Sequence, residues 1–345
     1  MNSNVKVRGF WTSRWGFILA ASGSAVGLGN IWKFPYITGQ NGGGAFVLVY
    51  LICILIIGIP VMMGELLIGR RGRQSPSHSI SHLAKEAGAP QVWTAMGFMG
   101  ISASFLILTF YVVIAGWAIA YIVTTATGTF RGATAEEVGA TFDTFLASPL
   151  QLIFWSTLVT VGTMVTVAGG VRKGLERAVT WLMPGMLVIL LILVGYAMST
   201  GSFIEGFNFL FKPDFTKLSP SAVLVALGHA FFTLSLASGV MIAYGAYLPD
   251  DTSIFQTSVI VAAADTAVAL IAGLAIFPIV FAYGLDVGKG PGLIFTTLPI
   301  AFGQMPFGTF FGTLFFIMLS LAAFTSAISL LEPTVAWIVE RFSVS

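Results

Sequence analysis

Residues 22–35 interrupt a hydrophobic segment with residues that a simple membrane-spanning helix avoids. The stretch reads Ser-Gly-Ser-Ala-Val-Gly-Leu-Gly-Asn-Ile-Trp-Lys-Phe-Pro. Backbone that leaves the helix at bilayer depth is tolerated only where protein covers it or where it lines a cavity. We therefore expect a broken first helix at mid-membrane, where freed carbonyls hold a cation and freed N–H groups hold an anion. The pattern is typical of a transporter rather than of an anchor.

Composition places most of the chain in a lipid bilayer. The 345 residues are 57% hydrophobic and 9% charged, whereas soluble domains carry roughly 25% charged residues. A helix needs about 20 apolar residues to cross a bilayer, so the longer segments predict tilted or interrupted helices. We expect an all-α polytopic protein with a single transmembrane domain over residues 1–345 and about eight spans, at 15–38, 44–69, 92–125, 150–168, 176–199, 221–247, 254–284 and 307–340.

The distribution of lysine and arginine predicts the orientation of these spans. With a cytoplasmic N-terminus, the basic residues that fall inside are Lys6, Arg8, Arg14, Arg70, Arg71, Arg73, Lys85, Arg172, Lys173, Arg177 and Arg341. Those that fall outside are Arg131, Lys212, Lys217 and Lys289. Because cytoplasmic loops carry an excess of basic residues, we expect a multi-pass protein of the cell (inner) membrane with its N-terminus in the cytoplasm.

A second interruption lies in the sixth span, at Phe232-Thr-Leu-Ser-Leu-Ala-Ser-Gly239. Breaks in spans one and six are five spans apart, which fits an inverted repeat of five helices with the two breaks facing each other at the midplane. The first repeat would be helices 1–5 within 1–199, and 221–345 would hold helices 6–8 of the second. Such a repeat needs ten helices, so the fold is expected to be truncated after helix 8, or the chain to be a fragment.

The segments between spans predict short surface structures. Residues 74–90 resemble a short interfacial helix, and the outer loops at 126–149 and 200–220 contain glycine, proline and acidic residues. The segment 286–306 is rich in glycine and proline. We expect it to form a re-entrant or capping loop on the outer side.

Motifs of common enzyme classes are missing from the sequence. It contains no His-Glu-x-x-His and no Gly-x-Ser-x-Gly, and glycines 42–44 are not followed by the Gly-Lys-Ser/Thr of a phosphate loop. We expect neither an enzyme nor an organic cofactor nor a nucleic-acid partner. The single cysteine, Cys53, excludes a disulfide within the chain.

Asp265, Glu65 and Glu332 lie within predicted spans, where an acidic residue costs about 2.5–3.5 kcal/mol on insertion scales and needs a partner or a function. Asp265 in span seven is interpreted as a cation ligand, the alternative being a hydrogen bond between helices. Glu65 at the end of span two is expected to bond to the backbone of a broken helix. Glu332 precedes Pro333 and is expected to compensate for carbonyls that the proline frees.

Basic and imidazole side chains in or near the spans allow two interpretations each. Lys33 would pair with an acid at an extracellular gate or extend to the outer interface. His229 is expected to be a hydrogen-bonded interior residue rather than a proton carrier. His78 and His82 lie four residues apart without an evident third ligand, so a solvated face is favoured over a metal site.

Longer motifs resemble those of the neurotransmitter:sodium symporter family. They are Gly-Ser-Ala-Val-Gly-Leu-Gly-Asn-Ile-Trp-Lys-Phe-Pro-Tyr with Asn41-Gly-Gly-Gly-Ala-Phe, then Gly170-Val-Arg-Lys-Gly-Leu-Glu-Arg, His229-Ala-Phe-Phe-Thr-Leu-Ser-Leu and Leu321-Ala-Ala-Phe-Thr-Ser. The likeness covers the whole chain and is greatest to the prokaryotic amino-acid branch. It implies a leucine-transporter-like fold. Family members have eleven or twelve spans, which agrees with the expected truncation.

The resemblance implies two sodium sites built from oxygen atoms, which hard cations prefer. The first would use the Ala25 carbonyl, Asn30, Thr233 and Asp265, together with the carboxylate of the bound amino acid. The second would use the carbonyls of Gly23, Val26 and Ala322 with the hydroxyls of Thr325 and Ser326. Without the resemblance, the last two hydroxyls would be expected to bond only to their own helix.

The resemblance also implies an amino-acid site and two gates. The site residues would be Ser24, Ala25, Gly27, Leu28, Gly29, Ile107, Tyr111, Phe232, Thr233, Ser235, Ser238, Ser326 and Leu330. Tyr111 would bond to the substrate carboxylate and Phe232 would close the outer lid, with Lys33 at the outer gate. Arg8 and Glu340 match the inner gate pair of the family, with Trp11 and Tyr247 nearby.

Two departures from other family members refine the expected function. Amine-transporting relatives carry an acid where this chain has Gly27, so a zwitterionic amino acid is expected here. Chloride-dependent relatives carry Asn where Asp265 stands, so chloride is expected to be unnecessary.

The sequence as a whole predicts sodium-coupled import of a neutral amino acid by alternating access. The substrate is expected to be hydrophobic or aromatic, because Ser238 leaves room in the pocket. The alternatives are a non-transporting amino-acid-binding relative and an inactive fragment of a transporter.

Overall fold

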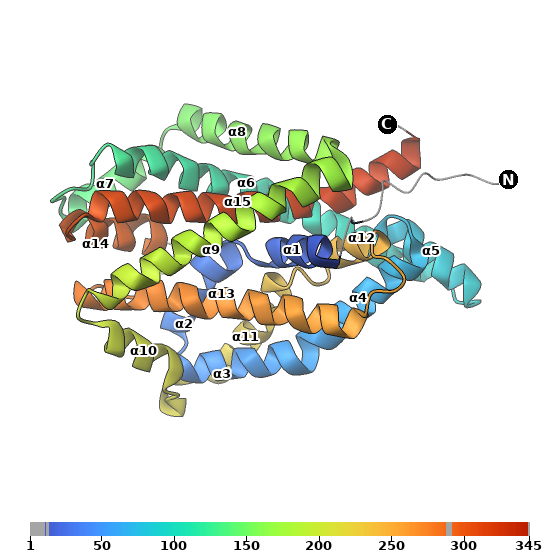
Figure 1. The fold of residues 1–345 in the computed structure, drawn as a ribbon, viewed down its shortest axis with the longest axis horizontal. Coiled ribbons are helices and arrows are strands. Elements are labelled where there is room, and N and C mark those ends of the chain that lie inside the picture. The colour runs from blue at the N-terminus through green and yellow to red at the C-terminus, as the bar shows by residue number, and fades with distance from the viewer. Residues whose placement is uncertain (1–10, 12–13, 288–291, 344–345) are drawn as a thin grey trace.

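The computed structural model describes residue 11, residues 14–287 and residues 292–343. Within these ranges the regular secondary structure is helical, and the only β-type contact is an isolated bridge between Gly43 and Pro213. Most of the long helices run along the long axis of the molecule (Figure 1). The helix α5 (Pro76–Glu86) lies at one end of the bundle, and α7 (Ala135–Leu146) lies at the other (Figure 1). We refer to these as the α5 end and the α7 end.

Six stretches of the described residues are long and apolar enough to cross a membrane, and they match six of the eight predicted spans. They are Gly44–Gly72, Gln91–Ala126, Pro149–Ala168, Lys173–Met198, Ile254–Ala282 and Gly308–Phe342. The helices within them are α3 (Gly44–Cys53), η2 (Ile54–Gly58), α4 (Ile59–Gly72), η3 (Gln91–Trp93), α6 (Thr94–Ala126), α8 (Pro149–Ala168), η4 (Val171–Glu176), α9 (Arg177–Met198), α13 (Ile254–Ala282) and α15 (Gly308–Phe342).

The other two predicted spans are interrupted, as expected. The first consists of α1 (Arg14–Ala25), the short π-helix η1 (Gly29–Lys33) and α2 (Phe34–Gln40). The sixth consists of α11 (Pro220–Thr233) and α12 (Val240–Ala246), which are joined by a non-helical linker at 234–239.

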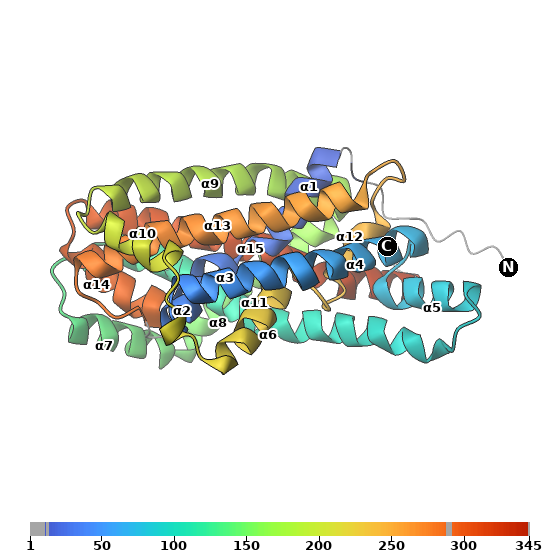
Figure 2. The same ribbon diagram turned by 90° about the horizontal axis from the view of Figure 1, so that it is seen from below.

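Short helices fill the loops that the sequence predicted to be structured. The loop at 74–90 forms α5, and Figure 2 shows α5 extending beyond the end of α4. The segments predicted as outer loops or as a capping loop contain α7, α10 (Phe203–Phe211), η5 (Phe215–Lys217), η6 (Leu293–Thr297) and α14 (Leu298–Gln304). Both α10 and α14 lie towards the α7 end (Figure 1).

The linker of the sixth span has an unusual backbone. Ser235 and Ala237 adopt positive φ angles of 54° and 59°, and Gly239 follows with 75°. Non-glycine residues rarely enter this left-handed region. The linker stays in place because Glu65 on α4 accepts a hydrogen bond from the Ala237 N–H at 2.7 Å, which confirms the predicted role of Glu65.

Close packing of α12 on α4 fixes the second half of the broken helix. A Cβ atom on Gly69 would lie 2.0 Å from the carbonyl oxygen of Ile242, and one on Gly245 would lie 2.7 Å from that of Leu66. Glycine at both positions therefore lets the two backbones approach. The linker is consequently bonded to α4 at Glu65 while α12 packs directly against the same helix.

We predict that Glu65→Ala lowers the stability of the folded protein by about 2 kcal/mol, because it removes the charge-assisted hydrogen bond that the Glu65 carboxylate accepts from the Ala237 N–H. Thermal unfolding of the purified protein in detergent measures this loss. Glu205→Ala on α10 removes an exposed acid and is the control, with an unchanged transition. Equal melting temperatures for the two variants would contradict the role assigned to Glu65.

Candidate functional site

The break in the first span is held open by side chains that take over backbone hydrogen bonds. The Gly27 N–H donates to Asn30 Oδ1 at 2.9 Å, and the Leu28 N–H donates to Tyr111 Oη at 3.1 Å. In a continuous helix these N–H groups would donate to the carbonyls four residues earlier, at positions 23 and 24. The carbonyls of Gly23 and Ser24 are therefore released from these two helical bonds.

Gly27 has no room for a side chain. A Cβ atom there would lie 2.1 Å from Ser326 Oγ and 2.7 Å from Tyr111 Oη. Three elements therefore meet at this point, namely the first break, α6 and α15. Only glycine allows their contact without displacing one of the two side chains.

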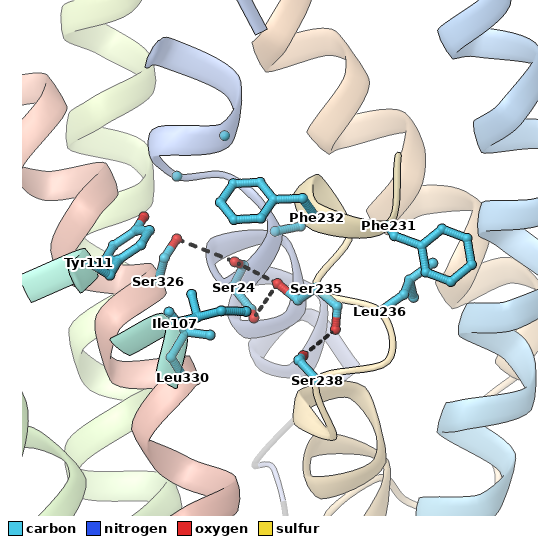
Figure 3. A pocket seen from close by; sticks show the side chains of 13 residues that line it. Ser24, Ile107, Tyr111, Phe231, Phe232, Ser235, Leu236, Ser238, Ser326 and Leu330 are labelled. Carbon is cyan, nitrogen blue, oxygen red and sulfur yellow. Dashed lines mark hydrogen bonds between the residues drawn. The ribbon is translucent and has the colours of Figure 1, made fainter. Parts of the chain in front are cut away.

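A cavity lies between the two broken helices, α6 and α15 (Figure 3). The side chains around it leave a volume of about 50 Å³, so the cavity is nearly closed in this conformation. Eleven of the thirteen predicted site residues line it, namely Ser24, Ala25, Gly27, Gly29, Ile107, Tyr111, Phe232, Ser235, Ser238, Ser326 and Leu330.

Two predicted residues lie outside the cavity lining and two unpredicted ones belong to it. Leu28 contributes its N–H to Tyr111, and Thr233 turns its hydroxyl to Asp265. Phe231 and Leu236 line the cavity instead, although their side chains point away from Tyr111 and Ser326 (Figure 3). Both residues are sequence neighbours of the predicted site residues Phe232 and Ser235. This adjacency is the sequence feature that could have identified them as part of the cavity lining.

The two broken helices meet at a cluster of hydroxyl groups in the cavity. Ser235 Oγ donates to the Ser24 carbonyl at 3.3 Å, and Ser326 Oγ reaches the same carbonyl at 3.3 Å (Figure 3). Ser238 Oγ donates to the Ser235 carbonyl at 2.7 Å. On the other side, Ile107 and Leu330 provide apolar surface (Figure 3). This arrangement suits a ligand with a polar end and an apolar side chain.

Asp265 on α13 is fully buried beside the first break. Its Oδ1 accepts hydrogen bonds from Asn30 Nδ2 at 2.7 Å and from Thr233 Oγ1 at 3.0 Å. Its Oδ2 lies 3.4 Å from the donating Tyr50 hydroxyl. The structure thus joins three of the predicted ligands of the first sodium site, Asn30, Thr233 and Asp265. Asn30 turns its amide nitrogen to Asp265 and its Oδ1 to the Gly27 N–H, whereas Thr233 and Asp265 contribute oxygen atoms of the kind that hard cations bind.

The predicted second group of ligands lies where α1 ends against α15. Ser326 Oγ is 3.5 Å from the Val26 carbonyl, and Thr325 Oγ1 donates to the Ala322 carbonyl at 3.0 Å. These hydroxyls and carbonyls are buried and derive from the two elements expected to share an ion. Gly23 packs towards α9, where a Cβ atom would lie 3.3 Å from the Met183 and Val179 side chains.

The described residues contain no cluster of three or more His, Cys, Asp or Glu side chains that would hold a metal ion. The two predicted cation positions instead combine one carboxylate, that of Asp265, with hydroxyl, amide and carbonyl oxygens. Such a donor set lacks the nitrogen and sulfur ligands that transition metals favour. It fits an alkali or alkaline-earth cation.

The predicted outer gate residue Lys33 contacts an aromatic ring. Its ammonium lies 4.1 Å from the centroid of the Phe232 ring, which is a cation–π contact. Phe232 in turn lines the cavity. The positive charge of Lys33 thus lies against Phe232, which was predicted to close the outer side of the cavity.

At the α5 end, Glu340 of the predicted inner gate pair contacts Ser75 and His78. Arg8 lies outside the described residues. Glu340 accepts hydrogen bonds from the Ser75 N–H at 2.8 and 2.9 Å and pairs with His78 Nδ1 at 2.7 Å. His82 is exposed and the His78 side chain is 35% exposed, so the pair lies on a partly solvated face, and His78 has in addition a partner that the sequence did not predict. Trp11 and Tyr247 pack against each other, with ring centroids 6.4 Å apart.

Glu332 accepts a hydrogen bond from the Tyr247 hydroxyl at 2.8 Å, a partner that the sequence did not predict. The prediction that His229 is hydrogen-bonded was wrong. His229 is buried between the rings of Phe34 and Tyr50. Neither of its ring nitrogens has a hydrogen-bond partner among the described residues.

Comparisons with known proteins agree with this geometry. The model of the "Sodium:neurotransmitter symporter family" matches residues 8–144 and 146–345. The chain is 42% identical to the uncharacterized sodium-dependent transporter YhdH of Bacillus subtilis, over 95% of this chain and 72% of that protein. It is 36% identical to an uncharacterized sodium-dependent transporter of Haemophilus influenzae, over 99% of this chain and 76% of that protein.

A solved structure confirms the predicted leucine-transporter-like fold. The crystal structure of MhsT in complex with L-phenylalanine superimposes with a TM-score of 0.89 at 48% sequence identity. The match covers 98% of this chain and 76% of that chain.

We predict that Tyr111→Phe loosens the first break, because the Leu28 N–H then loses its acceptor. The unmet bond corresponds to a stability loss of roughly 1–3 kcal/mol. Hydrogen exchange of peptides that cover residues 26–31 is expected to accelerate. Tyr283→Phe, which lies beyond α13, is the control without effect on these peptides, and unchanged protection in Tyr111→Phe would refute this role.

Proposed function

Because the chain belongs to the sodium:neurotransmitter symporter family, we propose that it imports a neutral amino acid together with sodium. The observation that carries this proposal is the cavity between two broken helices, directly beside the buried Asp265 cluster. In this arrangement the substrate and a cation share one set of freed backbone groups. Binding of each therefore favours binding of the other.

Two sodium positions follow from the oxygen atoms on either side of the first break. One would be held by the Ala25 carbonyl, Asn30, Thr233 and Asp265, and the substrate carboxylate would complete it. The other would be held by the carbonyls of Gly23, Val26 and Ala322 with the hydroxyls of Thr325 and Ser326. The hydrogen bonds that already join these residues support both assignments.

The cavity lining favours a zwitterionic amino acid over an amine. None of the thirteen lining residues that the structure describes is acidic, so no side chain there would neutralise an isolated ammonium group. The Ser24 carbonyl, which in this conformation accepts from the hydroxyls of Ser235 and Ser326, would accept from the substrate ammonium in place of one of them. The substrate carboxylate would face Tyr111 and the first sodium ion, which supplies the positive charge.

The residues that line the cavity favour a hydrophobic or aromatic side chain on the substrate. Ile107 and Leu330 form the apolar wall, and Ser238 is a small residue at the cavity. MhsT, which is similar over nearly the whole chain, has been crystallised with L-phenylalanine. We therefore propose L-phenylalanine and related large neutral amino acids as substrates.

Asp265 makes chloride unnecessary in this proposal. Two sodium ions and a zwitterion bring two positive charges into a buried site, and a fixed carboxylate compensates for one of them. A buried charge is stable only when it is paired and hydrogen-bonded. The three side-chain donors around Asp265 supply the hydrogen bonds.

The α5 end would face the cytoplasm of the cell. Arg70, Arg71 and Arg73 lie at the end of α4, and Lys85 lies on α5, as the excess of positive charge on the inner side requires. Arg131, Lys212 and Lys217 lie at the α7 end. The two broken helices would then move against the α6–α15 pair to open the cavity to one side at a time.

Sodium-gradient-driven uptake tests this function. We expect proteoliposomes of the protein to accumulate L-phenylalanine when sodium is outside and the interior is negative. Each sodium ion entering down 100 mV contributes about 2.3 kcal/mol. Accumulation that is equally strong with potassium in place of sodium would refute the proposal, and saturable binding without counterflow would favour a non-transporting relative.

We predict that Asp265→Asn raises the sodium concentration needed for half-maximal uptake at least tenfold, or makes uptake depend on added chloride. The reason is the loss of the fixed negative charge at the first cation position, since tenfold corresponds to about 1.4 kcal/mol. Asp143→Asn on the exposed face of α7 is the matched control. Wild-type sodium dependence without a chloride effect in Asp265→Asn would remove Asp265 from the site.

A further inference from the structure

Glu340 joins the C-terminal end of α15 to the first turn of α5. Both elements lie at the α5 end of the bundle (Figure 1). The two carboxylate oxygens of Glu340 accept from the Ser75 N–H at 2.8 and 2.9 Å. Ser75 directly precedes α5, and N–H groups at the start of a helix have no partner within the helix and attract negative charge. Glu340 therefore caps α5 from a distant position in the chain.

His78 bonds to the same carboxylate. Its Nδ1 lies 2.7 Å from Glu340 Oε2 and 3.1 Å from Ser75 Oγ. The His78 side chain is 35% exposed, whereas that of Glu340 is 15% exposed, so water reaches the ring more freely than the carboxylate. A protonated imidazole adds a positive charge to its hydrogen bond, and charged hydrogen bonds are roughly twice as strong as neutral ones. The contact of Glu340 with Ser75 and His78 is thus stronger when His78 is protonated.

Within the described residues, His78 is the only basic side chain that contacts Glu340. The arginines at the end of α4 have other partners, namely Thr252 for Arg70, Glu86 for Arg71 and Asp250 for Arg73. The other elements packed against α5 are η3 and α6, which carry no charged or imidazole side chain. The basic residues that follow on α5 and α15 are exposed, namely His82, Lys85 and Arg341.

The first turn of α5 also contacts the second break and α6. A Cβ atom on Gly239 would lie 3.2 Å from Pro76 Cγ, and one on Gly97 would lie 2.4 Å from Ser77 Cα. Residues 75–78 therefore touch the linker of the broken sixth span, α6 and the end of α15. In the proposed transport cycle the broken helices move against the α6–α15 pair. A strong contact between residues 75–78 and α15 opposes that movement at the α5 end.

We propose that His78 senses cytoplasmic pH, and that in its protonated form it holds Glu340 against α5 and keeps the α5 end closed. This inference rests on the proposed sodium-coupled function and orientation. Histidine changes its charge between about pH 5 and 8. Acidification of the cytoplasm therefore strengthens the contact and slows release of the substrate, and a rise in pH weakens the contact and speeds release.

The first test is the dependence of uptake on the pH inside proteoliposomes. Sodium-driven uptake of L-phenylalanine is measured with the lumen at about pH 6 or about pH 8 and the external medium held at about pH 8. We expect initial uptake to be about fivefold slower with the acidic lumen. Inverted molecules expose their α5 end to the constant external pH, so they dilute this effect without reversing it.

Three variants separate the charge of His78 from other effects of pH. His78→Gln keeps a hydrogen-bond donor but cannot become charged, and we expect its two rates to differ less than about twofold. His78→Lys carries a permanent positive charge and is expected to be slow at both lumen pH values. His82→Gln, on the exposed part of α5, is the matched control and is expected to keep the full response of the wild type.

Hydrogen exchange tests the contact without any transport. After correction for the chemical exchange rate, we expect peptides that cover residues 74–80 of the wild type to be about fivefold better protected at about pH 6 than at about pH 8. This difference is expected to disappear in His78→Gln and to remain in His82→Gln. Peptides of α7, at the opposite end of the molecule, serve as the internal reference.

Several results would overturn the inference. They are an equal lumen pH response in His78→Gln and the wild type, a loss of response in His82→Gln as large as that in His78→Gln, and fast uptake at both pH values in His78→Lys. If the wild type shows no sodium-driven uptake, the proposed function is refuted instead. Hydrogen exchange then decides alone, and protection of residues 74–80 that is independent of His78 contradicts the proposal.

Discussion

The structure depends on the requirement that every backbone group at bilayer depth finds a hydrogen-bond partner within the protein. Two of the spans are broken, and side chains from other helices meet this requirement at both breaks. Asn30 and Tyr111 accept from the N–H groups of Gly27 and Leu28, while Glu65 accepts from Ala237. Without these acceptors the breaks would be unstable, and the cavity between them would not exist.

The hydrogen bonds from side chains that replace backbone bonds at the breaks also give the site its chemical properties. N–H groups that bond to Asn30 and Tyr111 leave carbonyl oxygens of α1 available, and these oxygens lie next to the hydroxyls of Ser235 and Ser326. Asp265 adds a negative charge that three donors stabilise. A cation and an amino acid can thus bind where a continuous helix would offer neither charge nor free oxygen.

The sequence predictions were accurate where a feature depends on residues within one segment, and they failed where it depends on contacts between distant segments. Glu65 was correctly predicted to bond to a broken helix, because a buried acid near two breaks has few other partners. The pairing of Glu340 with His78 and the aromatic surroundings of His229 were not predicted. Both depend on helices that are distant in sequence, and helical periodicity within one segment carries no information about the partner.

The sequence by itself determined the spans, the positions of both breaks and the types of residue around them, because glycine, proline and intramembrane acids have strong local effects. It also carried the motifs that indicated the family. Only the tertiary structure decided which oxygen atoms meet, because α1, α6, α11, α13 and α15 contribute to one small volume from positions far apart in the chain. The close approach at Gly27, where a single added carbon would collide with Ser326 and Tyr111, is the physical reason that these atoms come together.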